Sequence, residues 1–319
     1  MKKTLSLIVA LVLVFSMALS LSATACAEEK IVIGFSPMTL VNEYFSAVLG
    51  AVEKVCEEND VELITYDPQS DSTVQATQID DMISAGIQAL VYIPVDSAGG
   101  RTVMQACKDA GVYVVNIDNV VIEDDFDVVD AVIASNNYQL GYISGEDVAK
   151  RFPDGANIVI AHSPTSESCN VTVGAFFDAI KDNAEDPSKY VDVFEFDGAG
   201  DTAKSFNAML DVLEAHDDID VVYCVNDASA LGVIQAIAES GKGEDIAIYG
   251  KDGSPNGKQA IAEGKMTQTS AQSPTSLGRI GAEYALKLIK GEEVPFETYL
   301  DAFSISVDNI KDFDLDAWE

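Results

Sequence analysis

Apolar and polar positions follow one another in blocks that predict strands separated by helices. In the stretch 218–253, an apolar run ends at Asn226 and Asp227, apolar residues at helical spacing follow, and a second apolar run leads to Asp252. This order of strand, helix and strand predicts a βαβ unit, the unit from which parallel sheets are built. Because open α/β sheets bind ligands at the carboxyl ends of their strands, we expect these three side chains to hold a small polar molecule.

The same pattern occurs earlier in the chain, over residues 89–118. One apolar run ends at Asp96, a helical pattern follows, and a second run ends at Asp118. Asp118 therefore stands in the first unit where Asp252 stands in the second. Such a repeat predicts two similar lobes, each presenting polar groups at its strand ends, which together would clamp a ligand.

The amino end predicts export. Met1-Lys2-Lys3 is followed by an uncharged apolar stretch, and we interpret residues 1–27 as a cleaved signal peptide. Two processing interpretations stand side by side: cleavage before Glu28, or an imperfect lipobox in which Cys26 carries a lipid anchor. No later apolar run approaches the ~20 residues that span a bilayer. We therefore expect an extracytoplasmic protein, periplasmic or at the cell surface, either secreted or lipid-anchored.

Charge and composition exclude several function classes. The chain has 53 acidic and 19 basic residues and a net charge of −34, which disfavours nucleic acid as a partner. Five cysteines without C-x-x-C or other metal spacing predict no metal site, and we expect no cofactor. With two histidines, no nucleophile–base pairing and no glycine-rich phosphate loop, the chain is not expected to be an enzyme. An acid/base pair of Asp118 and Asp252 is the weaker alternative.

Three stretches carry a family resemblance: ASNNYQLG at 134–141, VNDASALG at 225–232, and residues 249–272. With them, nearly all of 31–307 resembles the type I periplasmic sugar-binding proteins, the ribose- and galactose-binding group of ABC transporter substrate-binding proteins. The resemblance implies an α/β fold of two flavodoxin-like (Rossmann-like) parallel-sheet lobes joined by a three-strand hinge. Lobe one would comprise 28–135 plus 273–295, and lobe two 136–272 plus 296–319, with crossings near 135, 272 and 296.

The resemblance also implies a ligand set. Aromatic rings would cover the C–H face of a sugar, and amide and carboxylate groups would bind its hydroxyls. The implied positions are Ser36, Asn42, Tyr44, Phe45, Asp118, Asn119, Ser135, Asn170 (or Thr172), Gly200, Asn226, Asp252 and Gln272. Asn137 and His162 follow strand ends and join the candidate ligand-binding residues. Helix capping remains an alternative role for Asn226 and Asp252.

Departures from the family pattern narrow the ligand. The three arginines, Arg101, Arg151 and Arg279, fall outside the ligand positions, so an anionic ligand is disfavoured. Lys251 stands where family members commonly have an aromatic residue. We expect a monomeric solute-binding protein of an ABC importer, which closes on a neutral monosaccharide or polyol and docks on a membrane permease and its ATPase. The alternatives are a cationic or amine-bearing solute, or a sensor that presents its ligand to a membrane receptor.

Overall fold

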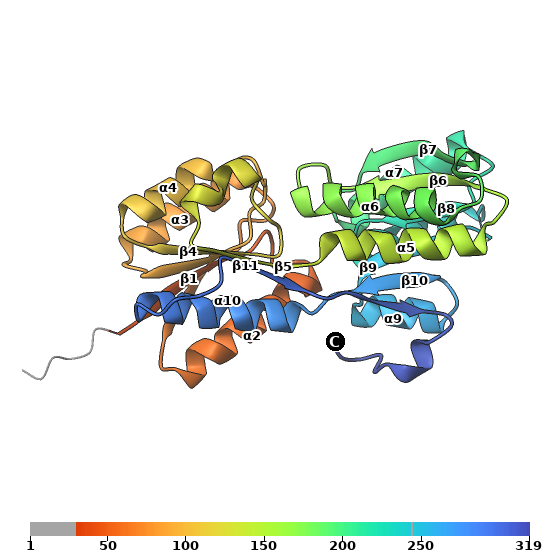
Figure 1. Ribbon diagram of the computed structural model, residues 1–319. Coiled ribbons are helices and arrows are strands. Elements are labelled where there is room, and N and C mark those ends of the chain that lie inside the picture. The colour runs from red at the N-terminus through yellow and green to blue at the C-terminus, as the bar shows by residue number, and fades with distance from the viewer. Residues whose placement is uncertain (1–29, 244) are drawn as a thin grey trace, which may run out of the picture. The chain divides into compact units, whose positions relative to one another are not determined.

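A computed structural model describes residues 30–243 and 245–319, so the expected signal peptide and Cys26 lie outside the described residues. The described chain forms two six-stranded sheets flanked by helices (Figure 1). The first sheet has the order β11-β5-β4-β3-β1-β2, and all its neighbouring strands are parallel. Its strands are β1 (Val32–Ser36), β2 (Glu62–Thr65), β3 (Ala89–Tyr92), β4 (Tyr113–Ile117), β5 (Ala131–Ser135) and β11 (Glu297–Leu300).

The second sheet repeats this order as β12-β10-β9-β8-β6-β7, with β12 antiparallel to β10. In both sheets the first five strands along the chain follow the flavodoxin-like order 2-1-3-4-5. The predicted α/β architecture of two parallel-sheet lobes is therefore confirmed. The strands are β6 (Ala156–His162), β7 (Tyr190–Asp197), β8 (Val221–Cys224), β9 (Ala247–Asp252), β10 (Gln268–Ala271) and β12 (Phe303–Ser306).

Helices cover both faces of each sheet (Figure 1). The first sheet packs between one pair of helices, α2 and α10, and another, α3 and α4, and the second between α5 and α6 on one face and α7, α8 and α9 on the other. Their bounds are α2 (Glu43–Glu58), α3 (Ser72–Ser84), α4 (Arg101–Asp109), α5 (Asn137–Arg151), α6 (Glu167–Asn183), α7 (Thr202–Ala215), α8 (Asp227–Ser240), α9 (Pro255–Ala262) and α10 (Pro274–Ile289), with 3₁₀ turns η1 (Glu123–Val128), η2 (Pro187–Lys189) and η3 (Ile310–Asp312). No helix among these residues is long and apolar enough to cross a membrane.

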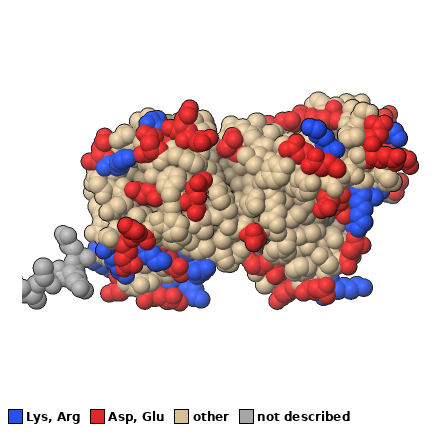
Figure 2. All heavy atoms as spheres, viewed as in Figure 1, with Lys and Arg blue, Asp and Glu red and all other residues tan. Residues whose placement is uncertain are grey.

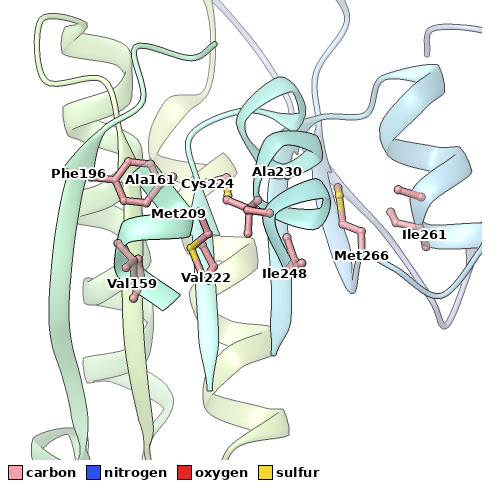
Figure 3. Close-up of a cluster of buried hydrophobic side chains, with 14 of the residues drawn as sticks. Val159, Ala161, Phe196, Met209, Val222, Cys224, Ala230, Ile248, Ile261 and Met266 are labelled. Carbon is pink, nitrogen blue, oxygen red and sulfur yellow. The ribbon is translucent and has the colours of Figure 1, made fainter. Parts of the chain in front are cut away.

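Burial on both faces explains why the strands are continuous apolar runs rather than alternating ones. In β6, Val159 faces a cluster that includes Met209 of α7 and Ala230 of α8 (Figure 3). The next residue, Ile160, packs on the opposite face with Phe176 of α6. Each such side chain contributes about 1.5–3 kcal/mol when fully buried. The sheets are thus rigid platforms whose strand ends are held in fixed positions.

The chain crosses between the sheets three times: after β5, after β10 and after β11. The third crossing was expected near 296, but β11 pairs in parallel with β5, so the chain leaves the first sheet only between Leu300 and Phe303. The Tyr284 hydroxyl of α10 lies 3.0 Å from Thr298 Oγ1 and ties β11 to the first lobe. Only Asp301 and Ala302 separate Leu300 from Phe303, and so short an interruption does not mark the break in the sequence. The remaining lobe bounds stay a prediction.

Candidate functional site

A cavity of about 560 Å³ lies at the carboxyl ends of strands from both sheets. Its walls come from the start of α2, the residue after β4, the first turn of α6, the loop before α7, and the ends of β8, β9 and β10. Eight of the thirteen candidate ligand-binding residues line it: Asn42, Tyr44, Phe45, Asp118, Asn119, Asn226, Asp252 and Gln272. Gly200, also implied by the resemblance, lines it too.

Asp118 and Asp252 occupy equivalent places, at the ends of the fourth strands of the two sheets. Both have left-handed backbone, with φ of 63° and 129°. A residue other than glycine pays about 1–3 kcal/mol for such a conformation, and the surrounding structure must hold it there. Strained backbone of this kind clusters at ligand sites, and here both examples place a carboxylate in the cavity wall.

Asp118 is fixed by an aromatic partner. The Tyr44 hydroxyl donates to Asp118 Oδ1 over 2.6 Å, and Tyr44 is almost fully buried. Burial raises the pKa of Asp118, while Lys251 and the Tyr44 hydrogen bond work against that rise. Burial and the carboxylates of Asp118 and Asp252 raise the pKa of Tyr44 well above its usual value. The phenol therefore stays protonated and acts as a donor to Asp118.

Asp252 is fixed through the residues at two chain crossings. Gln272 Nε2 donates to Asp252 Oδ1 over 2.7 Å, and the Ser135 hydroxyl donates to Gln272 Oε1 over 2.7 Å. Ser135 does not line the cavity but orients the amide that holds the carboxylate. Burial raises the pKa of Asp252 well above its usual value, Lys251 opposes the rise, and Asp227 adds to it. This carboxyl group consequently holds a proton more tightly than an exposed aspartate does.

Lys251 is the most informative residue that the candidate list lacked. It precedes Asp252 on β9, is 6% exposed, and lines the cavity. Burial acts to lower the pKa of its ammonium group, but Cys169, Asp252 and Asp118 outweigh burial and raise it. Among the described residues its ammonium group has no hydrogen-bond or ion-pair partner, which leaves its donors available to a ligand. A lysine inside an apolar strand was the signal that could have identified it.

Two predicted amides are already engaged by the protein. Asn119 Oδ1 accepts from the Ser97 and Ser166 hydroxyls, 3.1 and 2.8 Å away, so it links β3–α4 to the start of α6. Asn226 caps α8 by accepting from the Ser229 amide at 2.9 Å, and its Nδ2 donates to the Gly200 carbonyl at 3.0 Å. The capping role predicted for Asn226 is confirmed, whereas α9 is capped by Ser254 and not by Asp252.

Five candidate residues lie outside the cavity wall: Ser36, Ser135, Asn137, His162 and Asn170. The Ser36 hydroxyl accepts from Gln75 Nε2 over 3.1 Å, and His162 Nδ1 lies 2.7 Å from Glu195 Oε1 on the neighbouring strand. Asn170 is exposed and bonds to the Pro164 carbonyl and to Glu167, both near the start of its own helix. Thr172, its alternative, is buried and donates to the Ser168 carbonyl.

The first turn of α6 supplies wall residues that sequence reasoning missed. The apolar pattern predicts this helix from Val171, but it begins at Glu167 because Ser166 accepts from the Cys169 amide as an N-cap. The earlier start brings Ser168 and Cys169 to the cavity. Ser166, five residues before the expected helix start at Val171, was the available signal.

Comparisons with known proteins agree with this arrangement. A family model described as a periplasmic binding protein domain matches residues 33–293. The ribose import binding protein of Bacillus subtilis is 30% identical over 301 residues, which cover 92% of this chain and 95% of that protein.

Two solved structures share the fold. A solute-binding protein of an ABC transporter from Mycobacterium smegmatis, with bound glycerol, is 27% identical with a TM-score of 0.83, covering 91% of this chain and all of that one (100%). Another from Bacillus halodurans, with bound myo-inositol, is 25% identical with a TM-score of 0.82, covering 90% and 98%.

Proposed function

Because the chain belongs to the periplasmic binding protein domain family, we propose that it is the extracytoplasmic solute-binding protein of an ABC importer and binds a neutral monosaccharide or polyol. Relatives named for ribose import, and neighbours holding glycerol or myo-inositol, support this class of ligand. A membrane permease and its ATPase are the partners that this role requires. The cavity would bind the solute and the bound form would dock on the permease.

The observation that carries the proposal is a set of withdrawn polar groups in the cavity wall, the carboxyl groups of Asp118 and Asp252 and the ammonium group of Lys251; Asp201 and Lys204, which also line the cavity, are more exposed. Asp118 and Asp252 offer acceptors, and Lys251 offers donors. A hydroxyl group both donates and accepts, so neighbouring hydroxyls of one sugar or polyol satisfy both kinds of group. The rings of Tyr44 and Phe45 supply apolar surface for the C–H face of such a ligand.

Charge separates this ligand class from its alternatives. Two carboxyl groups repel an anionic solute, and the cavity has no arginine to form a bidentate pair with it. The carboxyl groups alone would favour an amine-bearing solute, but the buried Lys251 places a like charge beside it. A neutral solute avoids both costs.

A thermal-shift panel tests the proposal on the wild-type protein. The panel contains D-ribose, D-xylose, D-allose, myo-inositol and glycerol, with putrescine and ribose 5-phosphate as charged competitors. A ligand at 100 times its Kd should stabilise the folded state by about 2.7 kcal/mol. We expect a rise in Tm with a neutral member. A rise in Tm with putrescine alone would contradict a neutral solute as the ligand. As a control, Asp217→Asn, which alters an exposed carboxyl group, should show the same Tm changes as the wild type.

A further inference from the structure

The segment of residues 313–319, which follows η3, is attached to the second lobe. The Phe313 ring stacks on Phe303 of β12 at 5.9 Å, and Phe313 and Leu315 pack against the core that α7, α8 and α9 cover. The acids that alternate with them, Asp312, Asp314 and Asp316, are exposed. Acidic and apolar residues therefore alternate along 312–316 because one side of the segment packs on the protein and the other faces solvent.

A buried lysine fixes the far part of this segment. Lys258 of α9 is 0% exposed, and its ammonium group donates to the Ala317 carbonyl at 2.6 Å and to Glu319 Oε1 at 2.8 Å. A buried ammonium group is tolerated only where it is paired and hydrogen-bonded. Residues 317 and 319 are thus held on both sides of Trp318.

Trp318 reaches from the second lobe to the first. Its ring centroid lies 5.8 Å from that of Tyr44 on α2, with the rings near perpendicular at 77°. Edge-to-face packing of this kind is a favourable aromatic geometry. In addition, Asn256 Nδ2 of α9 donates to Glu43 Oε2 over 2.7 Å, so a second contact joins the second lobe to the start of α2.

We infer that Trp318 is a positioning residue for the binding cavity. It does not line the cavity itself, but it packs on Tyr44, whose hydroxyl holds Asp118 in the wall. Lys258 fixes the segment, Trp318 fixes the Tyr44 ring, and Tyr44 fixes the carboxylate. The segment 313–319 therefore joins the two lobes beside the cavity and restrains the ligand's departure. The inference rests on the proposed function for its ligand, but not for the contact between the lobes.

The contact is testable without ligand because Trp318 is the only tryptophan of the chain. Acrylamide quenching of its fluorescence should be weak in the wild type. Lys258→Met, which removes the anchor without burying an unpaired charge, and Tyr44→Ala, which removes the partner ring, should each increase quenching toward that of N-acetyltryptophanamide. Quenching of wild-type strength in both variants would overturn the inference.

The effect on binding is tested by calorimetric titration with D-ribose and with myo-inositol. Trp318→Ala should weaken binding about tenfold, as the loss of one fixed hydrogen-bonding group does, and Trp318→Phe should recover most of that loss. Phe194→Ala, which removes an exposed ring on β7, should bind like the wild type.

A double-variant cycle separates positioning from a general structural effect. Tyr44→Phe keeps the ring but removes the hydrogen bond to Asp118, so adding Trp318→Ala should cause little further loss of affinity. Fully additive losses would show that Trp318 does not act through Tyr44. If neither compound gives heat with the wild type, D-ribose and myo-inositol are excluded as ligands, and the quenching result alone decides the inference.

Discussion

Asp118 and Asp252 combine two costs, left-handed backbone and carboxyl groups withdrawn from water. Neither feature stabilises the protein without ligand. A ligand that binds these carboxyl groups explains why both features are present. One side chain, Tyr44 or Gln272, holds each carboxyl group, so its remaining acceptor capacity has a fixed direction.

Removing the Asp252 carboxyl group should weaken ligand binding at least tenfold, because hydroxyls that it accepts from would be left unsatisfied in a buried site. The comparison is Asp252→Ala against Asp217→Asn, which alters an exposed carboxyl group. Titration calorimetry with the solute that raises Tm measures the effect. Equal affinities would remove Asp252 from the site.

Asp227, at the start of α8, gives a pH dependence. Burial raises its pKa from 3.8 to about 6, against hydrogen bonds from the Thr269 hydroxyl and the Ser254 amide. The folded state therefore binds this proton more tightly than the unfolded state does, and this group's contribution to stability is lost as pH rises through that window.

Asp227→Asn lacks this titration, so its free energy of unfolding minus that of the wild type should increase from about pH 4 to about pH 6 and then level off. Urea unfolding at a series of pH values measures the difference between the two proteins. A flat difference between Asp227→Asn and the wild type would mean that the pKa of Asp227 is not raised.

At the scale of elements, the close approach of α5 and α6 depends on glycine. A Cβ at Gly141 would collide with the Thr172 carbonyl, and one at Gly145 with the Phe176 carbonyl. The first turn of α6 forms the cavity wall around Cys169. The packing of α5 on α6 therefore helps to fix the position of that wall.

Gly141→Ala should lower the free energy of unfolding by about 1–3 kcal/mol through overpacking. Gly174→Ala makes the same chemical change on the exposed side of α6, where nothing lies within 4 Å, and should raise it by up to about 1 kcal/mol. Chemical denaturation measures both. Similar effects of the two substitutions would contradict the close packing of α5 on α6.

The repeat that pairs Asp118 with Asp252 was visible in the sequence, because parallel strands are apolar runs whose carboxyl ends are marked by polar residues. Side-chain direction was not visible: Ser36 and His162 also follow such runs, yet their partners Gln75 and Glu195 keep them outside the cavity wall. Lys251 was noticed only as a departure, since its role depends on the two carboxyl groups that the fold brings to it.

For the whole molecule, the acidic balance dominates. Figure 2 shows acidic side chains spread over the visible face, with fewer basic ones among them. A net charge of −34 repels itself in the compact state. This self-repulsion lowers the stability of the folded state, and dissolved salt should weaken the repulsion by screening it.

Raising NaCl from about 0.01 M to about 0.1 M shortens the Debye length from about 30 to about 10 Å and should raise Tm. Choline chloride at matched ionic strength is the control, because screening does not depend on the cation. A fall in Tm with both salts would mean that attractive pairs outweigh the self-repulsion.

The crystal structure of the protein with the neutral solute that gives the largest rise in Tm tests the central claim most directly. In that structure, solute hydroxyls should lie within hydrogen-bonding distance, about 2.5–3.2 Å, of the Asp118 and Asp252 carboxyl groups and of the Lys251 ammonium group. A solute bound elsewhere, or one that contacts none of these three groups, would contradict it.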